Sequence, residues 1–257
     1  FMTHEGQYDN MNAFFRTNGY DEVFSQEDYP ADKVVNSFGV QDDFLYDYAI
    51  PVLNQRAATG QPFFATLLSI SNHPPYVIPP FFHPKTSEPE TQIVEYADWA
   101  LRQFFEEARK QPWFDNTIFV LEGDHGKLVG DAECELPESY NHIPLMIYSS
   151  RIQPEEKTTF GGQVDIQPTI LGLLNIDYLQ NNFGVDLLKE ERPCMFYTAD
   201  NMVVGRNDTL LYLYNYETQQ ELTYDIGNGK LNAVPMDDSF LPLKEYSFSM
   251  LQSAEFL

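Results

Sequence analysis

Three short and almost uninterrupted apolar runs, at 63–70, 117–121 and 143–148, constrain the fold of this chain most. A strand that is apolar at nearly every position is covered on both faces, which is typical of a parallel sheet with helices on either side. Amphipathic patterns with helical spacing occupy 42–56 and 91–111, before and between these runs. The alternation predicts an α/β fold whose main sheet is largely parallel and flanked by helices.

The same patterns predict the core. Each expected core residue belongs to a strand without a polar face or to the apolar stripe of a helix. We expect burial of Phe64, Leu67, Leu68, Ile118, Val120, Leu145, Ile147, Ile170 and Leu173.

The pattern changes after 193. Short apolar runs alternate there with Gly, Asn and Asp, which is typical of antiparallel hairpins, and the final residues have a helical pattern. We expect a core over 1–192 and a small antiparallel extension with a terminal helix over 193–257, packed on the same domain.

Charge and composition exclude several classes of protein. The 257 residues include 15 basic and 39 acidic ones, a formal charge of −24, which disfavours nucleic acid as a partner. No apolar run reaches the roughly 18 residues that span a bilayer. Cys134 and Cys194 are isolated, so neither a cysteine zinc site nor a disulfide-rich scaffold is expected. The chain starts without a signal-peptide pattern or a first strand, and we expect it to be a fragment of a longer protein.

Polar side chains follow two of the apolar runs directly. His73 comes just after the first run, and Asp124 and His125 follow the second. The carboxyl ends of parallel strands meet at one edge of a sheet, where ligands bind. A single histidine in a turn is more often an ordinary surface residue, but two at matched positions favour a site facing one cleft.

Asp124 and His125 are a plausible metal pair. A carboxylate and an imidazole suit zinc, manganese or a similar ion, and Gly123 and Gly126 allow the backbone to turn. Two ligands are fewer than the roughly four of a tetrahedral site, so further donors must come from elsewhere. The acidic residues at 131, 133 and 135 are interpreted as a solvated stretch.

Several longer segments occur in an order that resembles a known family. They are PFFATLLSISNHPPY, EYADWALRQFFEEARKQPWFDNTIFVLEGDHGK, NHIPLMIY and GGQVDIQPTILGLLNI. Together they resemble the sulfatase-like branch of the alkaline phosphatase superfamily, and within it the extracytoplasmic domain of lipoteichoic acid synthase-type phosphoglycerol transferases. The resemblance covers about 3 to 225. It implies an alkaline phosphatase-like fold, here missing its N-terminal strands.

The resemblance also implies roles for individual residues. Asp124 and His125 match the metal-binding pair of the family, whose ion would be manganese, zinc, magnesium or calcium. His73 matches a catalytic histidine that contacts the phosphate or the leaving group, and His4 resembles a second catalytic histidine lining the substrate site. His142 is a further candidate for substrate binding, or an ordinary polar residue at the start of a strand. His83 matches nothing and is expected on the surface.

The family's nucleophile is a threonine preceded by an acidic metal ligand, and both would lie upstream of Phe1. Sulfatases proper use a Cys or Ser within C/S-x-P-x-R, and Cys194 is not in that context. The resemblance therefore implies a metal-dependent phosphoryl transferase acting on a phosphodiester head group, incomplete in this chain. A sulfuric ester hydrolase, a phosphodiesterase and a non-catalytic remnant are the alternatives.

The expected substrate is a phospholipid-type ester, or another phosphate or sulfate ester. The expected location is the extracytoplasmic face of the cell envelope. Membrane attachment would occur only through a segment absent from this chain.

Overall fold

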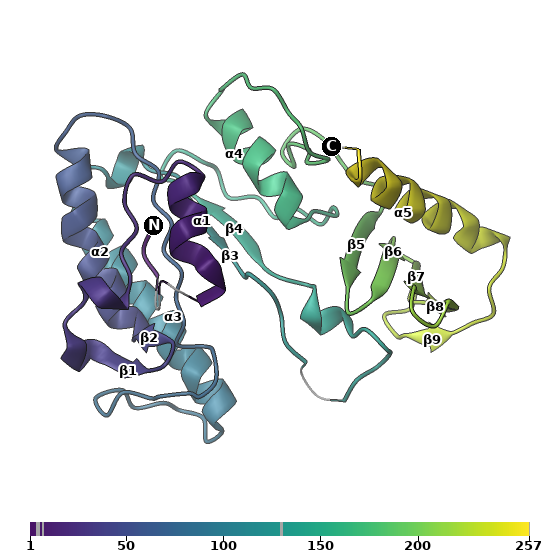
Figure 1. Cartoon of the computed structure of the whole chain (residues 1–257), viewed down its shortest axis with the longest axis horizontal. Helices are drawn as coiled ribbons and strands as arrows, with labels where there is room; N and C mark the ends of the chain where they lie inside the picture. The colour runs from purple at the N-terminus through teal and green to yellow at the C-terminus, as the bar shows by residue number, and fades with distance from the viewer. Residues whose placement is uncertain (4–5, 7, 129–130, 257) are drawn as a thin grey trace. The chain divides into compact units, whose positions relative to one another are not determined.

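The computed structural model describes residues 1–3, 6, 8–128 and 131–256. The chain divides into two compact units (Figure 1). Unit 1 comprises Phe1–Phe119 and Tyr148–Ile152, and unit 2 comprises Val120–Ile147 and Gln153–Leu257. The predicted division after 192 stays a prediction.

Unit 1 is built around two helices that pack side by side (Figure 1). Its elements are α1 (Met11–Thr17), the antiparallel pair β1 (Val34–Asn36) and β2 (Gly39–Val40), α2 (Asp42–Ala57) and α3 (Pro89–Ala108). The two helices predicted at 42–56 and 91–111 are confirmed, and α2 continues through Pro51. The predicted apolar stripe of α3 is buried at Ile93, Tyr96, Ala100, Phe104 and Ala108.

Parallel pairing in unit 1 joins three extended segments. Met2 bridges Phe24 on one side and Leu67 on the other, both in parallel. The Met2 N–H donates to Thr66 O at 2.9 Å, and the Leu68 N–H donates to Met2 O at 2.9 Å. The apolar run at 63–70 is therefore extended and pairs in the predicted direction, with one bridge among the described residues.

The predicted core residues are less covered than expected. Phe64 is 73% exposed, and its predicted burial is wrong. The other eight expected residues are partly buried. Within the described residues, the run at 63–70 pairs along one side only, at Leu67. Burial of a strand's side chains depends on what covers its two faces, so continuous apolarity alone did not identify the buried positions.

The predicted strands at 117–121 and 143–148 correspond to β3 (Phe119–Glu122) and β4 (Leu145–Tyr148), which form a two-stranded sheet. Unit 2 also contains α4 (Ile166–Leu173) and α5 (Leu241–Ala254). Its main sheet has the order β5 (Met195–Ala199), β6 (Met202–Arg206), β7 (Leu210–Asn215), β8 (Gln220–Asp225) and β9 (Asn232–Ala233), antiparallel throughout. The antiparallel C-terminal extension and its terminal helix are thus confirmed.

The five-stranded sheet has a core on each face because its residues alternate. Leu211 and Leu213 pack with Leu136 on one face, whereas Tyr212 packs with Phe240 and Leu243 on the other. Helix α5 covers the second face (Figure 1).

Gly205 permits the close approach of α5. A Cβ at this position would lie 2.5 Å from Ser247 Oγ and 3.1 Å from the Leu243 carbonyl oxygen.

No helix in the described ranges is both long enough and apolar enough to cross a membrane.

Candidate functional site

Asp124 and His125 occupy the turn that follows β3, with side chains 72% and 69% exposed. The His125 N–H donates to Asp124 Oδ1 at 2.9 Å. His125 Nδ1 lies 2.7 Å from Gly126 O, and because a carbonyl can only accept, Nδ1 must carry the hydrogen. The neutral ring then leaves its Nε2 lone pair available, 3.8 Å from Asp124 Oδ2. A backbone bond at Nδ1 with a free Nε2 is a common arrangement of metal-binding histidines.

The backbone of this turn is held from two directions. Gln163 Nε2 donates to the main-chain oxygens of Asp124 at 2.8 Å and Gly123 at 3.3 Å. The Gly126 N–H donates to Tyr140 O at 2.9 Å. A Cβ at Gly126 would lie 1.9 Å from Ser139 O, so this close approach requires glycine.

The chemistry of the pair fits a divalent cation. One carboxylate oxygen and one imidazole nitrogen are suitable donors, and both are accessible to solvent. Burial, and next the negative charge of Asp124, raise the pKa of Glu122, which indicates a negative potential at this strand end. Among the described residues, no group of three or more His, Cys, Asp or Glu side chains could hold a metal. Asp124 and His125 are therefore interpreted as two donors of a larger set of metal ligands.

His73 lies in unit 1, in the loop after the run at 63–70. Its N–H donates to Ile70 O at 2.8 Å, and its Nδ1 lies 2.6 Å from Pro74 O. Because the Pro74 carbonyl can only accept, Nδ1 carries the hydrogen, and the Nε2 lone pair of the neutral ring stays available. The ring packs on Phe38 with centroids 4.0 Å apart. An exposed imidazole held by its other nitrogen can exchange a proton with a bound ester.

Buried Asp42, at the start of α2, fixes the loop that carries His73. Asp42 Oδ1 accepts the N–H groups of Ile70 at 3.1 Å and Ser71 at 2.9 Å. Ser71 Oγ accepts the Asp42 N–H at 3.0 Å and donates to Gln41 Oε1 at 2.9 Å. Burial raises the pKa of Asp42, although the hydrogen bonds from Ser71 and Ile70 lower it. The sequence predicted a helix here but not this role of its first carboxylate.

We expect Asp42→Asn to stabilise the chain relative to wild type, increasingly so as the pH rises. The folded chain holds the Asp42 proton more tightly than the unfolded chain does. That contribution to stability is full below the unfolded pKa and is lost as the pH rises through the raised folded value. The Asn oxygen can still accept both N–H bonds without a charge. We measure the free energy of unfolding by urea titration from pH 3 to pH 8. The value for Asp42→Asn minus that for wild type should grow over this range by about 1.4 kcal/mol per unit of pKa shift.

Asp32→Asn is the matched control, because Asp32 is exposed in the same unit. A difference between Asp42→Asn and wild type that stays constant with pH would contradict the assigned shift.

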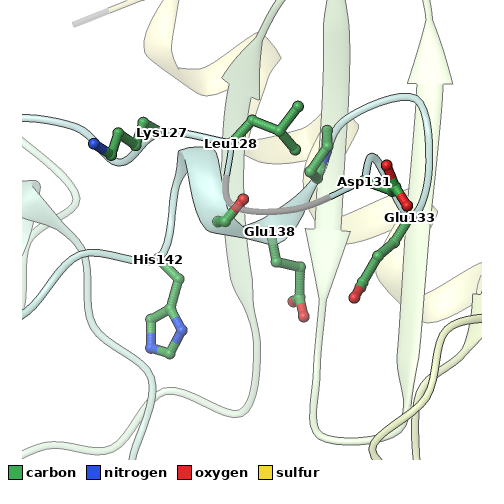
Figure 2. Close-up of a pocket in the computed structure, with 8 residues that line it drawn as sticks. Lys127, Leu128, Asp131, Glu133, Glu138 and His142 are labelled. Carbon is green, nitrogen blue, oxygen red and sulfur yellow. The ribbon is translucent and has the colours of Figure 1, made fainter. Parts of the chain in front are cut away.

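His142 lines a cavity of about 470 Å³ in unit 2. The wall is formed by Lys127, Leu128, Asp131, Glu133, Pro137, Glu138, Ser139 and His142. In Figure 2, Lys127 and His142 lie to one side, Asp131 and Glu133 to the other, and Glu138 between them. Asp131, Glu133 and Glu135 are exposed, as the interpretation of a solvated stretch expected, and the first two also line this cavity. The cavity assigns no role to His142, and its part in substrate binding stays a prediction.

The C-terminal sheet holds this loop. Leu136 is 2% exposed and belongs to the core on one face of the sheet. Tyr224 of β8 donates its hydroxyl to Glu135, and Arg206 of β6 pairs with Glu138 while stacking over Phe160 at 5.3 Å. The segment following the Asp-His turn is therefore built onto the five-stranded sheet.

The remaining predicted residues have different outcomes. His4 lies outside the described residues, and His83 is exposed, as expected. His73 belongs to unit 1, whereas Asp124 and His125 belong to unit 2. Their placement in one cleft stays a prediction.

Sequence reasoning missed a buried ion pair beside α4. Asp165 stands directly before α4, but its carboxylate makes no capping bond to the first turn of this helix. It pairs instead with Arg192, whose Nε lies 3.1 and 3.0 Å from the two carboxylate oxygens. The same carboxylate accepts the N–H groups of Gly162 and Val185, each at 2.8 Å. The sequence shows only an Asp and an Arg in a polar, turn-rich region. That pattern does not indicate that the two side chains form an ion pair.

A family model described as Sulfatase matches residues 2–176 of this chain. Lipoteichoic acid synthase 1 of Bacillus subtilis (strain 168) is 27% identical over 243 residues, which cover 86% of this chain and 36% of the relative. Lipoteichoic acid synthase 2 of the same organism is 26% identical and covers 71% of this chain and 31% of the relative. The chain thus spans about a third of the length of these curated relatives.

Two solved structures share the fold over almost the whole chain. One is a protein of the alkaline phosphatase superfamily from Vibrio parahaemolyticus, with a TM-score of 0.85, 26% identity and coverage of 99% of this chain and 64% of that one. The other is the lipoteichoic acid synthase LtaP from Listeria monocytogenes, with a TM-score of 0.80, 22% identity and coverage of 98% and 67%. The predicted α/β, alkaline phosphatase-like fold is confirmed.

Proposed function

The chain belongs to the sulfatase family of the alkaline phosphatase superfamily, and on this premise we propose that it is part of a metal-dependent enzyme that transfers a phosphoryl group from a phosphodiester head group. The observation that carries the proposal is the Asp124–His125 turn, where Nε2 and a carboxylate oxygen lie 3.8 Å apart and exposed. The similarity to lipoteichoic acid synthases favours a phosphoglycerol-type substrate over other esters.

A divalent ion, whether manganese, zinc, magnesium or calcium, would supply positive charge that lowers the pKa of an attacking hydroxyl and screens the phosphoryl oxygens. Asp124 and His125 would provide two of its ligands. The remaining ligands and the nucleophile would come from residues outside those described.

We assign the imidazoles of His73 and His4 to proton transfer and phosphate contact. His73 presents Nε2 away from its bond to Pro74 O, so it can donate a proton to the departing alcohol when protonated. His142 would contact the alcohol part of the substrate from the cavity wall. Because the chain carries a formal charge of −24, attraction of an anionic ester depends on these local groups.

For the intact protein we propose a place on the extracytoplasmic face of the cell envelope, with attachment to the membrane through a segment outside this chain. The catalytic part would be the core over 1–192, and the part over 193–257 would support it. The contacts of Tyr224 and Arg206 with the 127–142 loop favour such a supporting role.

A sulfuric ester hydrolase is the second candidate, favoured by the description of the matching family model. The two can be separated in the intact protein with bis(p-nitrophenyl) phosphate and p-nitrophenyl sulfate, each with added Mn²⁺ and with EDTA. We expect metal-dependent cleavage of the phosphodiester. Faster cleavage of the sulfate ester would favour the second candidate, and cleavage of neither would contradict both.

A titration with Mn²⁺ tests whether the ligand set is complete. We expect weak binding to the 257-residue chain and tight binding to the intact protein, since two donors lack the binding energy of a full site. Equal affinity in both would show that the donors within this chain suffice.

A further inference from the structure

Gln163 lies outside the Asp-His turn and its neighbouring loop, yet its side chain bonds to the backbone of the turn. It lies in the 3₁₀ turn Gln163–Asp165, directly before α4. Its single Nε2 group donates to two consecutive carbonyls, those of Gly123 and Asp124. Two bonds from one amide to neighbouring carbonyls restrict rotation of the peptide between them.

The position of Gln163 is itself fixed by a buried network. Asp165 is fully buried and accepts the Gly162 N–H at 2.8 Å, which closes the 3₁₀ turn around Gln163. Arg192 holds the Asp165 carboxylate in turn. The amide of Gln163 therefore projects from a rigid support although the side chain is exposed.

We propose that Gln163 is a positioning residue for the Asp124–His125 pair. Asp124 and His125 are adjacent in sequence, so rotation of the backbone at Asp124 would turn their side chains apart. By fixing the carbonyls of Gly123 and Asp124, Gln163 keeps the carboxylate oxygen and the imidazole Nε2 directed to one side. The proposal rests on the proposed function only for the presence of a metal at this turn. The two hydrogen bonds from Gln163 to the backbone, called the clamp below, belong to the chain itself.

Three substitutions distinguish the effect of the Nε2 donor from that of the size and shape of the Gln163 side chain. Gln163→Met keeps the length and loses all polarity, whereas Gln163→Glu keeps the shape and replaces the donor with acceptors. Gln163→Lys restores a donor of similar reach. Gln167→Ala is the control, because Gln167 lies one turn along on α4 and accepts a bond only from Asn182 among the described residues.

Hydrogen exchange of the His125 and Gly126 amides is the first measurement, made in the intact protein. We expect exchange about 10-fold faster in Gln163→Met and Gln163→Glu, which is the effect of losing hydrogen bonds worth about 1.4 kcal/mol. Gln163→Lys and the control should exchange as wild type does. Unchanged urea midpoints would show that all variants fold, and unchanged exchange in Gln163→Met and Gln163→Glu would overturn the clamp.

Mn²⁺ affinity, measured by calorimetry on the same intact proteins, tests the positioning role. We expect about 10-fold weaker binding in Gln163→Met and wild-type affinity in Gln167→Ala. Faster exchange with unchanged affinity would overturn the positioning role. Failure of the wild type to bind Mn²⁺ would contradict the proposed function, and the exchange measurement would still decide whether the clamp exists.

Discussion

Asp124→Ala or His125→Ala is expected to abolish metal binding and phosphodiester cleavage by the intact protein, with a loss of activity of at least about 1000-fold. Each change removes one of the two donors that this turn provides, and metal stabilisation of transition-state charge is worth several kcal/mol. The measurements are a Mn²⁺ titration and the release of alcohol from a model phosphodiester. Folding should be unaffected, because both side chains are exposed.

His83→Ala is the matched control for His125→Ala. His83 is also exposed, and neither the sequence nor the structure connects it with the site. Its activity should equal that of wild type. Wild-type metal affinity in either Asp124→Ala or His125→Ala would remove the basis of the proposed function, whereas loss in the control alone would indicate a different site.

Asp165→Ala is expected to lower the free energy of unfolding of unit 2 by about 3–5 kcal/mol. It leaves the Arg192 guanidinium, whose side chain is only 10% exposed, without its carboxylate partner, and it also frees the N–H groups of Gly162 and Val185. An uncompensated buried charge is the main cost of such a substitution. Urea unfolding monitored by far-UV circular dichroism measures the change.

Arg192→Ala and the double variant complete the cycle for this pair. Because the pair is buried, the double variant should lose less stability than the sum of the two single variants. Lys189→Ala is the control, since it breaks the pair with Asp186 in the same region, in which the lysine side chain is 67% exposed, and it should cost about 1 kcal/mol or less. Equal losses for Asp165→Ala and Lys189→Ala would contradict the importance assigned to the buried pair.

The segment at 131–142, which follows the Asp-His-Gly turn, is anchored on the five-stranded sheet by Leu136 and Glu138. Residues far apart in sequence, such as Glu135 and Tyr224, hold it in place. The C-terminal sheet therefore contacts the segment that follows the Asp-His-Gly turn.

Local periodicity was a good guide to elements that bury a single face. The stripe of α3, with an apolar residue every three or four positions, is buried as predicted. Such a stripe depends on the residues of the helix itself, and the sequence carries that information directly.

Continuous apolar runs were a poorer guide because their burial depends on neighbours. Phe64 lies in an apolar run and is nevertheless exposed, because the burial of a side chain depends on what covers the face from which it projects. Nothing in the run itself distinguishes this case from a central strand. The number of strands and helices around a run decides how much of it is covered.

The sequence by itself determined the helices α2, α3 and α5, the strands β3 and β4, the Asp-His-Gly turn after a strand, and the family resemblance that the comparisons confirmed. Only the tertiary structure decided that Asp42 holds the His73 loop, that Asp165 pairs with Arg192, and that Gln163 bonds to the turn at Asp124. The physical reason is the range of the interactions. Hydrophobic periodicity is set within one element, whereas each of these polar contacts joins residues about 27 to 39 positions apart, and its partner is fixed only when the chain has folded.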